Sequence, residues 1–279
     1  MSKSLSIGDF EITTVQDHRG PDRDPSQIYP DVPGTAWDPY RGFALDPDGF
    51  YRSQWRGHLI RPSDGGPALL VDTGMGPGPH DHTGMPGELL ASLSALGVEP
   101  EDIGIVVITH THGDHIGWNV SYDGGTPRPT FPNARYIVAR ADWEHYSRQE
   151  NSNEAFDRSV KPLEGLGVLE LVEGVHEIRP GVSTLPTNGH TPGHQCILVK
   201  SGGQTGVVTG DLFHNVAQIS EQDWCPIFDW DTTISTRSRR ELLGRAEREG
   251  WTVFSGHLGI DKSIGKVVRS GEKPSWQPL

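Results

Sequence analysis

The feature that most constrains this chain is a run of four potential metal ligands in the hexapeptide His110-Thr111-His112-Gly113-Asp114-His115. The run directly follows the apolar segment IGIVVIT at 103–109, and such an abrupt change is typical of a buried strand that ends at a functional site. If these imidazoles and carboxylates were ordinary core residues, each would need its own hydrogen-bonding partner. A metal supplies those partners together, so the run predicts a metal site.

The spacing within the run indicates more than one ion. On an extended segment, His110 and His112 project to the same side, so both can bind one ion at about 2.1 Å. Gly113 permits a bend in the backbone after that segment. Asp114 and His115 come at the turn that follows, where they can bind a second ion.

Three further candidates, His190, Asp211 and His257, each stand at the end of a strand-like segment. A single histidine in such a place is more often a hydrogen-bonded structural residue than a ligand. Together with the hexapeptide, however, the three complete a ligand set for two ions. Their order along the chain is the one expected if successive strands converge on one edge of the sheets.

The remaining sequence alternates predicted strands with predicted helices. Strands are expected at 5–16, 58–62, 68–74, 103–109 and 135–139, near 167–171, 183–187, 195–200 and 205–210, and at 251–255 and 265–269. Helices are expected at 86–96, in parts of 140–163 and at 232–249. This alternation predicts an α/β fold with helices outside two sheets. We expect one domain over 1–279.

The segment at about 20–57 is expected to be an irregular loop, because it is crowded with Pro, Asp and Gly. It also carries the aromatic residues Trp37, Tyr40, Phe43 and Phe50, which must pack somewhere. A lid over the site, a contact in a homodimer and a surface loop held by its own rings are all compatible with this composition.

Composition narrows the partners and the location. A formal net charge of -13 leaves no basic face for nucleic acid or anionic lipid. No stretch has the length of an apolar membrane span, and the N-terminus lacks the apolar core of a signal peptide, so we expect a cytoplasmic protein. Cys196 and Cys225 are too few for a disulfide scaffold and are expected to be reduced thiols.

The motifs HTHGDHIG, GHTPGH, GDLFH and SGH, with VDTG at 71–74, resemble the metallo-β-lactamase superfamily from about residue 5 to the last strand. The resemblance implies an αββα sandwich and two divalent ions, expected to be Zn²⁺. It assigns the first ion to His110, His112 and His190, the second to Asp114, His115 and His257, and the bridging position to Asp211. Asp72 would have a supporting role rather than bind metal.

The resemblance also implies a mechanism. Two ions about 3.5–4 Å apart can share a hydroxide, which would attack a lactone or ester carbonyl, with Asp114 and Asp211 orienting it. His214 is the third catalytic candidate, because it stands where the lactonases carry a tyrosine that contacts the substrate. His214 would either donate a hydrogen bond to substrate or support a metal ligand. His194 carries the same ambiguity, and a supporting role is favoured.

Within the superfamily, the chain looks most like quorum-signal lactonases and methyl-parathion-hydrolase-like proteins. Asp211 argues against a true β-lactamase. The acidic chain and the aromatic loop favour a neutral, partly apolar small-molecule substrate. Phosphotriester and thioester hydrolysis remain alternatives. A mononuclear-iron persulfide dioxygenase is disfavoured by the complete second ligand set. The particular substrate, the metal used in the cell and the oligomeric state stay open.

Overall fold

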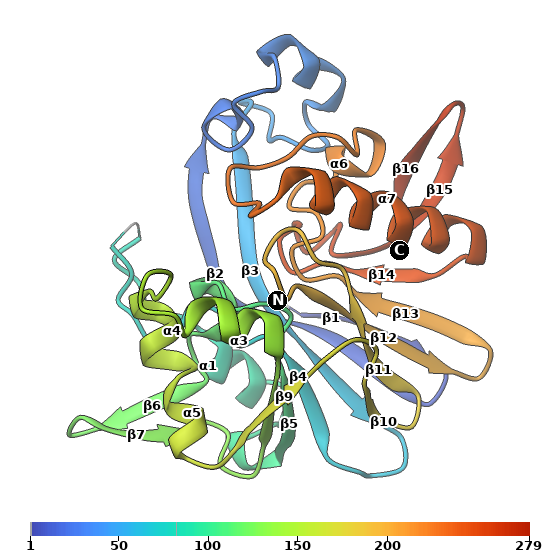
Figure 1. The fold of residues 1–279 in the computed structure, drawn as a ribbon. Helices are drawn as coiled ribbons and strands as arrows, with labels where there is room; N and C mark the ends of the chain where they lie inside the picture. Colours follow the sequence, from blue (N-terminus) through green and yellow to red (C-terminus); the bar gives the residue numbers. More distant parts are fainter. Residues whose placement is uncertain (1, 82) are drawn as a thin grey trace.

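A computed structural model describes residues 2–81 and 83–279, and it contains two seven-stranded sheets with helices on their outer sides (Figure 1). The first sheet has the order β1 (Lys3–Ile7), β2 (Phe10–Arg23), β3 (Tyr51–Pro62), β4 (Ala68–Val71), β5 (Ile103–Val107), β8 (Arg135–Ala139) and β9 (Leu169–Val172). The second has the order β10 (Glu177–Arg179), β11 (Val182–Pro186), β12 (Gln195–Ser201), β13 (Gln204–Val208), β14 (Thr252–Phe254), β15 (Ile264–Ser270) and β16 (Lys273–Pro278).

The core is arranged in three layers, because the sheets bury both faces. Between the sheets, apolar side chains of both pack together, including Ile12, Val107 and Phe254. The outer face of the first sheet is covered by α1 (Leu89–Ser94), α3 (Arg140–Tyr146), α4 (Glu154–Ser159) and α5 (Pro162–Gly165). The second is covered by α6 (Ala217–Ser220) and α7 (Thr232–Glu249). The predicted αββα sandwich is therefore confirmed.

Parallel pairing explains why the candidate ligands meet. Strands β4, β5, β8 and β9 are mutually parallel, and β13 pairs in parallel with β14, whereas the other neighbours in the two sheets are antiparallel. Parallel strands bring their carboxyl ends to the same edge, where α/β sheets bind ligands. The hexapeptide follows β5 and includes the short helix α2 (Gly113–Ile116), while Asp211 follows β13 and His257 follows β14.

Helix α7 has the same bounds as the predicted helix at 232–249. The Asp231 side chain accepts a hydrogen bond from the backbone N–H of Ile234, and Gly250 ends the helix with a positive φ of 68°. Its buried face carries Leu242, Leu243 and Ala246. No helix within the described residues is long and apolar enough to cross a membrane.

The predicted irregular loop at 20–57 is shorter than expected. Residues 20–23 continue β2 and residues 51–57 begin β3, so the irregular part runs over 24–50 and contains the 3-10 helices Pro25–Gln27 and Gly34–Tyr40. The long β2–β3 pairing shifts register between Gln16 and His18 and again between Arg19 and Asp22, which composition alone does not reveal. Tyr29 and Trp37 are fully buried in a small aromatic cluster of this loop, whereas Phe43 and Phe50 are exposed, so the expectation that all four aromatic residues pack is wrong for these two.

Some elements escaped prediction because their sequences are polar or very short. These are the hairpin of β6 (Val120–Asp123) and β7 (Thr126–Pro129), the 3-10 helix Pro100–Asp102, β10, α6 and β16. Strands β10 and β16 are the two edge strands of the second sheet, and β6 and β7 form a separate two-stranded sheet. Their omission leaves the predicted architecture unchanged.

Candidate metal centre

The structure brings all seven predicted ligands to one edge of the sandwich, in two groups that share one carboxylate. The first ligand set comprises His110, His112, His190 and Asp211, and the second comprises Asp114, His115, Asp211 and His257. Within each set the potential ligand atoms lie within 4.8 Å of one another. Asp211 belongs to both sets, which is the arrangement expected of a carboxylate that bridges two ions.

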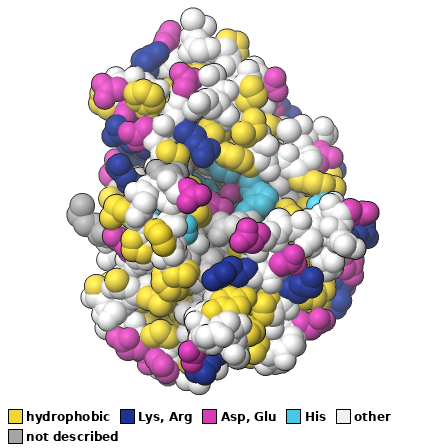
Figure 2. Space-filling model, turned by 90° about the vertical axis from the view of Figure 1, so that its left-hand side faces the viewer, with side chains coloured by type: hydrophobic (Ala, Val, Ile, Leu, Met, Phe, Trp, Pro, Cys, Tyr) yellow, Lys and Arg dark blue, Asp and Glu magenta, His cyan; other side chains and the backbone are white. Residues whose placement is uncertain are grey.

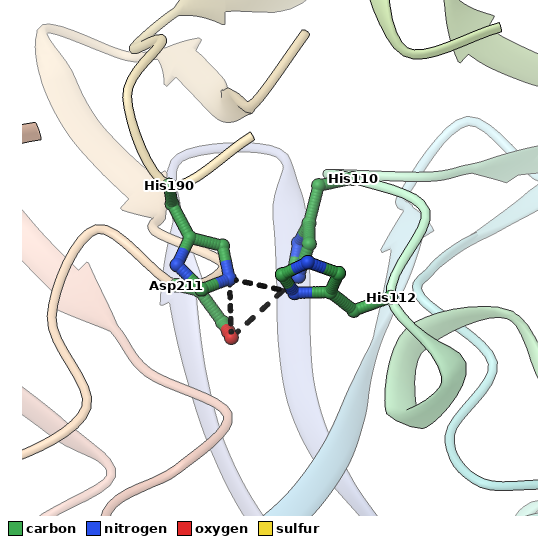
Figure 3. Close-up of side chains that lie close together, drawn as sticks. All are labelled: His110, His112, His190 and Asp211. Atoms are coloured by element: carbon green, nitrogen blue, oxygen red, sulfur yellow. Dashed lines mark hydrogen bonds and ion pairs between the residues drawn. The ribbon is translucent and has the colours of Figure 1, made fainter. Parts of the chain in front are cut away.

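In the first ligand set, the ligand atoms converge on one oxygen of Asp211 (Figure 3). His190 Nε2 lies 3.2 Å from Asp211 Oδ2, and His110 Nε2 lies 3.6 Å from the same oxygen. His112 turns its Nδ1 toward the centre, 2.9 Å from His190 Nε2. The three imidazoles come from the segments after β5 and β11, so distant parts of the chain build this set.

In the second ligand set, the other oxygen of Asp211 is the meeting point. His257 Nε2 lies 2.7 Å from Asp211 Oδ1, and His115 Nε2 lies 3.1 Å from it. Asp114 Oδ2 lies 3.6 Å from His115 Nε2 and 3.9 Å from His257 Nε2. The two oxygens of Asp211 therefore face different groups of histidines.

The residues fit two metal ions. His110 Nε2 and His115 Nε2 are buried atoms without a well-aligned hydrogen-bond partner in the described part of the chain. Nitrogen and carboxylate donors at these separations suit a borderline metal such as zinc. A hydrogen-bonded core cluster explains this arrangement less well than a metal site does, because two imidazole nitrogens that face each other repel when both are protonated.

Gly113 is explained differently from the sequence-based expectation. It begins α2 and has no positive φ, so no unusual backbone bend is needed there. A side chain at this position would meet the Ala155 Cβ at 3.3 Å, so close packing against α4 favours the glycine. Gly210, before Asp211, does need its glycine: its φ is +49°, and a Cβ would lie 2.7 Å from Thr109 Oγ1.

Asp72 contacts His115 directly and reaches His110 only through Thr109, as expected of a supporting residue. Its Oδ2 lies 2.8 Å from His115 Nδ1, so the ring can donate from Nδ1 and keep Nε2 for a metal. Thr109 donates its hydroxyl to the same carboxylate at 2.8 Å, and that hydroxyl lies 3.1 Å from His110 Nδ1. Asp72 has a positive φ of 61°, a conformation uncommon outside glycine, which marks it as a constrained functional position.

Two supporting contacts were not predicted from the sequence. Asp142, fully buried, accepts hydrogen bonds from the Thr111 and Gly193 N–H groups and from the Thr191 hydroxyl, so it ties the hexapeptide to the turn that carries His190. Asp229 Oδ1 lies 2.9 Å from His190 Nδ1. Neither residue stands in a recognisable motif. His257 Nδ1 instead lies 2.8 Å from a backbone oxygen, that of Gln54.

His194 and His214 occupy different positions around Asp211. His194 Nε2 accepts a hydrogen bond from the Asp211 N–H at 3.0 Å, and its Nδ1 lies 3.0 Å from the Thr187 carbonyl oxygen. His194 therefore holds the backbone of Asp211 in place. This position fits the supporting role that the sequence favoured. His214 Nε2 lies 3.1 Å from Asp211 Oδ2, and its ring stacks on His257 with the centroids 5.2 Å apart.

Five of the candidate ligands, His112, Asp114, His190, Asp211 and His257, line a cavity of about 490 Å³. Figure 2 shows histidine and acidic side chains in a hollow whose rim carries hydrophobic and basic side chains. Apart from ligands, the lining includes His214, the rings Tyr51, Trp55 and Phe228, and the side chains Arg23, Ser53, Met75 and Asn153. His214 therefore touches both Asp211 and the cavity. Sequence analysis did not name the other lining residues individually, but Arg23, Tyr51, Ser53 and Trp55 lie within the segment at 20–57, for which a lid over the site was one alternative.

The pKa values in this cluster follow from burial and from the neighbouring carboxylates. Burial opposes the charged form of His190, but Asp211 and Asp229 outweigh it and raise its pKa to about 9. Burial, reinforced by His190, lowers the pKa of His112 to about 3. Burial would raise the pKa of Asp211, but His115 and the other histidines hold it well below its usual range. The shared carboxylate is therefore ionised and available for metal.

Residues 58–257 match the family model of the metallo-beta-lactamase superfamily, and the chain belongs to this superfamily. An N-acyl homoserine lactonase from Bacillus sp is 29% identical over 216 residues, covering 72% of this chain and 79% of that protein. Another, named AttM, from Azorhizobium caulinodans, is 33% identical over 185 residues, covering 60% and 63%. The predicted resemblance to quorum-signal lactonases is thus confirmed.

Solved structures confirm the fold. A hydrolase of the beta-lactamase superfamily, AbOPH, superposes with a TM-score of 0.84 at 22% identity and covers 100% of this chain and 97% of its own. The dizinc quorum-quenching lactonase AidC, solved with a product, superposes with a TM-score of 0.82 at 21% identity, covering 100% and 97%. Both similarities extend over nearly the whole of each chain, so they include the loop at 24–50.

Proposed function

We propose that this protein is a dinuclear-metal hydrolase of lactones or esters, and that the two ligand sets sharing Asp211 bind two zinc-like ions. The observation that carries the proposal is the sharing itself: each oxygen of one buried carboxylate faces its own group of histidines. Two metal ions held by these residues would lower the pKa of a water molecule toward neutrality and polarise the substrate carbonyl. The lactonase relatives support the choice of a lactone or ester.

In this proposal the residues of the chain have three kinds of role. Asp211 holds both sites in register, and Asp114, partly exposed at the cavity, is placed to orient the attacking group. Asp72 fixes His115 with Nδ1 as the donor. His214 is the candidate for contact with the substrate, because it lines the cavity and its buried Nδ1 has no hydrogen-bond partner among the described residues.

The cavity supports a small, neutral and partly apolar substrate. Three aromatic rings and Met75 line it, and Arg23 is the one Lys or Arg side chain among the described lining residues. An apolar wall with a few polar groups suits an acyl group joined to a polar head. Arg23 contributes a hydrogen-bond donor for a carbonyl oxygen without requiring a polyanionic ligand.

The experiment that tests this proposal is a screen of purified, metal-analysed protein. A lactone, an aryl ester, a thioester and a phosphotriester with the same alkyl chain should be compared by kcat/KM. We expect the lactone or the ester to be hydrolysed fastest, and His190→Ala to abolish that hydrolysis. A preference for the thioester or the phosphotriester would reassign the substrate class, and no turnover of any of the four by the two-metal protein would refute the proposal.

A further inference from the structure

A fully buried arginine stands behind the first ligand set. Arg239 lies on the buried face of α7 and has no exposed surface. Its Nε donates a hydrogen bond to the carbonyl of Leu212 at 2.8 Å. Leu212 is the residue that directly follows the shared Asp211. One terminal nitrogen, Nη1, donates to the Gln222 carbonyl at 2.8 Å and to that of Trp224 at 3.1 Å.

The remaining nitrogen of Arg239 reaches a carboxylate that contacts a proposed ligand. Arg239 Nη2 lies 3.3 Å from Asp229 Oδ2, and Asp229 Oδ1 lies 2.9 Å from His190 Nδ1. Both side chains of this ion pair are completely buried. The three groups form a chain from α7 through Asp229 to the imidazole, and each oxygen of Asp229 has one partner.

The backbone holds the same histidine a second time. The Trp230 N–H donates to the His190 carbonyl at 3.0 Å, and the Asp231 N–H donates to the Gly189 carbonyl at 2.9 Å. Residues 229–231 therefore fix both the ring and the main chain of the turn that carries His190. Asp231 also caps α7, so this turn is connected to the first residue of that helix.

The ion pair fixes the orientation of the Asp229 carboxylate. Arg239 Nη2 faces one oxygen of Asp229, so the other oxygen faces His190 Nδ1. A carboxylate held in this way can accept a hydrogen bond from the His190 Nδ1–H group and leaves His190 Nε2 turned toward Asp211, 3.2 Å from its Oδ2.

We infer that Arg239 and Asp229 are a positioning pair, which sets how tightly the first ligand set binds its ion by fixing the ring orientation and tautomer of His190. This inference rests on the proposed metal centre. It places a determinant of metal affinity on α7, outside the motifs that carry the ligands. Neither residue touches the ion or the substrate.

The test uses three variants: Asp229→Asn, Arg239→Met and the double variant that combines these two changes. Arg240→Met is the control. Arg240 is the next residue on α7, and its ion pair with Asp223 is exposed, so this control removes a neighbouring arginine without touching His190. Zinc affinity of the metal-free proteins should be measured by competition with a chelator, resolving the two binding steps. NMR of the zinc-loaded proteins should follow the His190 Nδ1–H signal, and thermal unfolding of the metal-free proteins should report folding.

We expect Asp229→Asn and Arg239→Met each to weaken one binding step by about 10–100-fold and to shift or abolish the His190 Nδ1–H signal. Because the two act as one unit, the double variant should lose no more than the stronger single variant. Arg240→Met should match the unsubstituted protein. If Arg239→Met does not fold, Arg239→Lys, which keeps the charge, should retain most of the affinity, and Asp229→Asn decides the matter.

Unchanged affinity and an unchanged His190 signal in folded Asp229→Asn would overturn the inference while leaving the proposed function intact. Fully additive losses in the double variant would also overturn it, because they would show two independent structural roles. If the unsubstituted protein binds no zinc, both the metal centre and the positioning pair are refuted.

Discussion

The two ligand sets share Asp211 but are supported in different ways. In the second set, His115 is backed by Asp72, which follows β4 and takes its other hydrogen bonds from Thr109, a neutral residue. In the first set, His190 is backed by Asp229, whose other partner is the buried cation Arg239. Asp72 is thus held by neutral donors of Thr109, next to the metal-binding hexapeptide, whereas Asp229 is held by the charged side chain of Arg239 on helix α7. The comparison teaches that ligands chosen from local motifs can depend on partners that no motif contains.

Removal of a ligand should have the largest effect and should not depend on which carboxylate stands behind it. His190→Ala deletes a buried ligand of the first set, so we expect metal loss and a fall in kcat/KM of about 10³-fold or more. Metal analysis and kinetics check this. His145→Ala is the control, since His145 contacts only the rings of Tyr146 and Trp230 in the described contacts. His58, although outside the motifs, is buried and is a poorer control. Full activity with both ions in His190→Ala would show that the first ligand set is wrongly assigned.

His214 contacts Asp211, which belongs to both ligand sets, and it also lines the cavity. A substitution of His214 can therefore distinguish a role in supporting Asp211 from a role in contacting the substrate. His214→Phe keeps bulk and removes the ring nitrogens, so we expect kcat/KM to fall by about 10²-fold while two ions per chain remain. Metal analysis of the same sample distinguishes the two roles. Parallel loss of metal and activity would place His214 among the groups that support Asp211, and unchanged activity would remove it from the mechanism.

Asp72→Asn tests the support of the second ligand set, as Asp229→Asn tests that of the first. Asp72 contacts His115 directly and reaches His110 through Thr109, so both binding steps should weaken, by about 10–100-fold. Asp229→Asn should affect one step only. Chelator competition on the two variants side by side measures the difference. A single affected step in Asp72→Asn would contradict the connection through Thr109.

The smallest expected effect is a release of protons when metal binds. In the metal-free chain, Asp211 and Asp229 raise the pKa of His190 to about 9 despite burial, and Asp211 likewise raises that of His257. At pH 7 His190 is therefore protonated before an ion binds and must lose a proton to become a ligand, so apparent zinc affinity should rise with pH up to about 9. Calorimetry of zinc binding in buffers of different ionisation enthalpy counts the protons. No release at pH 7 would contradict the raised pKa.

The fold and the convergence of the candidate ligands could be predicted because their signals are local. An apolar segment that ends in HTHGDH, and single ligands at the ends of later strands, need only sequence spacing. The bounds of α7 agree with the expected helix at 232–249, and the residues that cap it, Asp231 and Gly250, are its immediate neighbours in sequence. The loop at 24–50 was overestimated because residues 20–23 and 51–57 pair with each other across 27 intervening positions, and such pairing has no local signature.

The supporting residues could not be predicted because their partners are distant in sequence. Asp229 is 39 residues from His190, and Asp142 is 31 residues from Thr111. Arg239 did leave one signal: it occupies the buried face of α7 with Leu242, Leu243 and Ala246, where a charged residue requires a buried partner. Helical periodicity alone could have marked Arg239 as unusual, but it could not have named Asp229.

The central claim is that one shared carboxylate holds two ions, and metal analysis of the native protein tests it most directly. Protein purified without chelators should contain about two zinc-like ions per chain, and Asp211→Asn should lose affinity for both, because Asp211 belongs to each ligand set. One iron per chain, together with oxygen consumption in the presence of a persulfide, would contradict the account and favour a mononuclear dioxygenase instead.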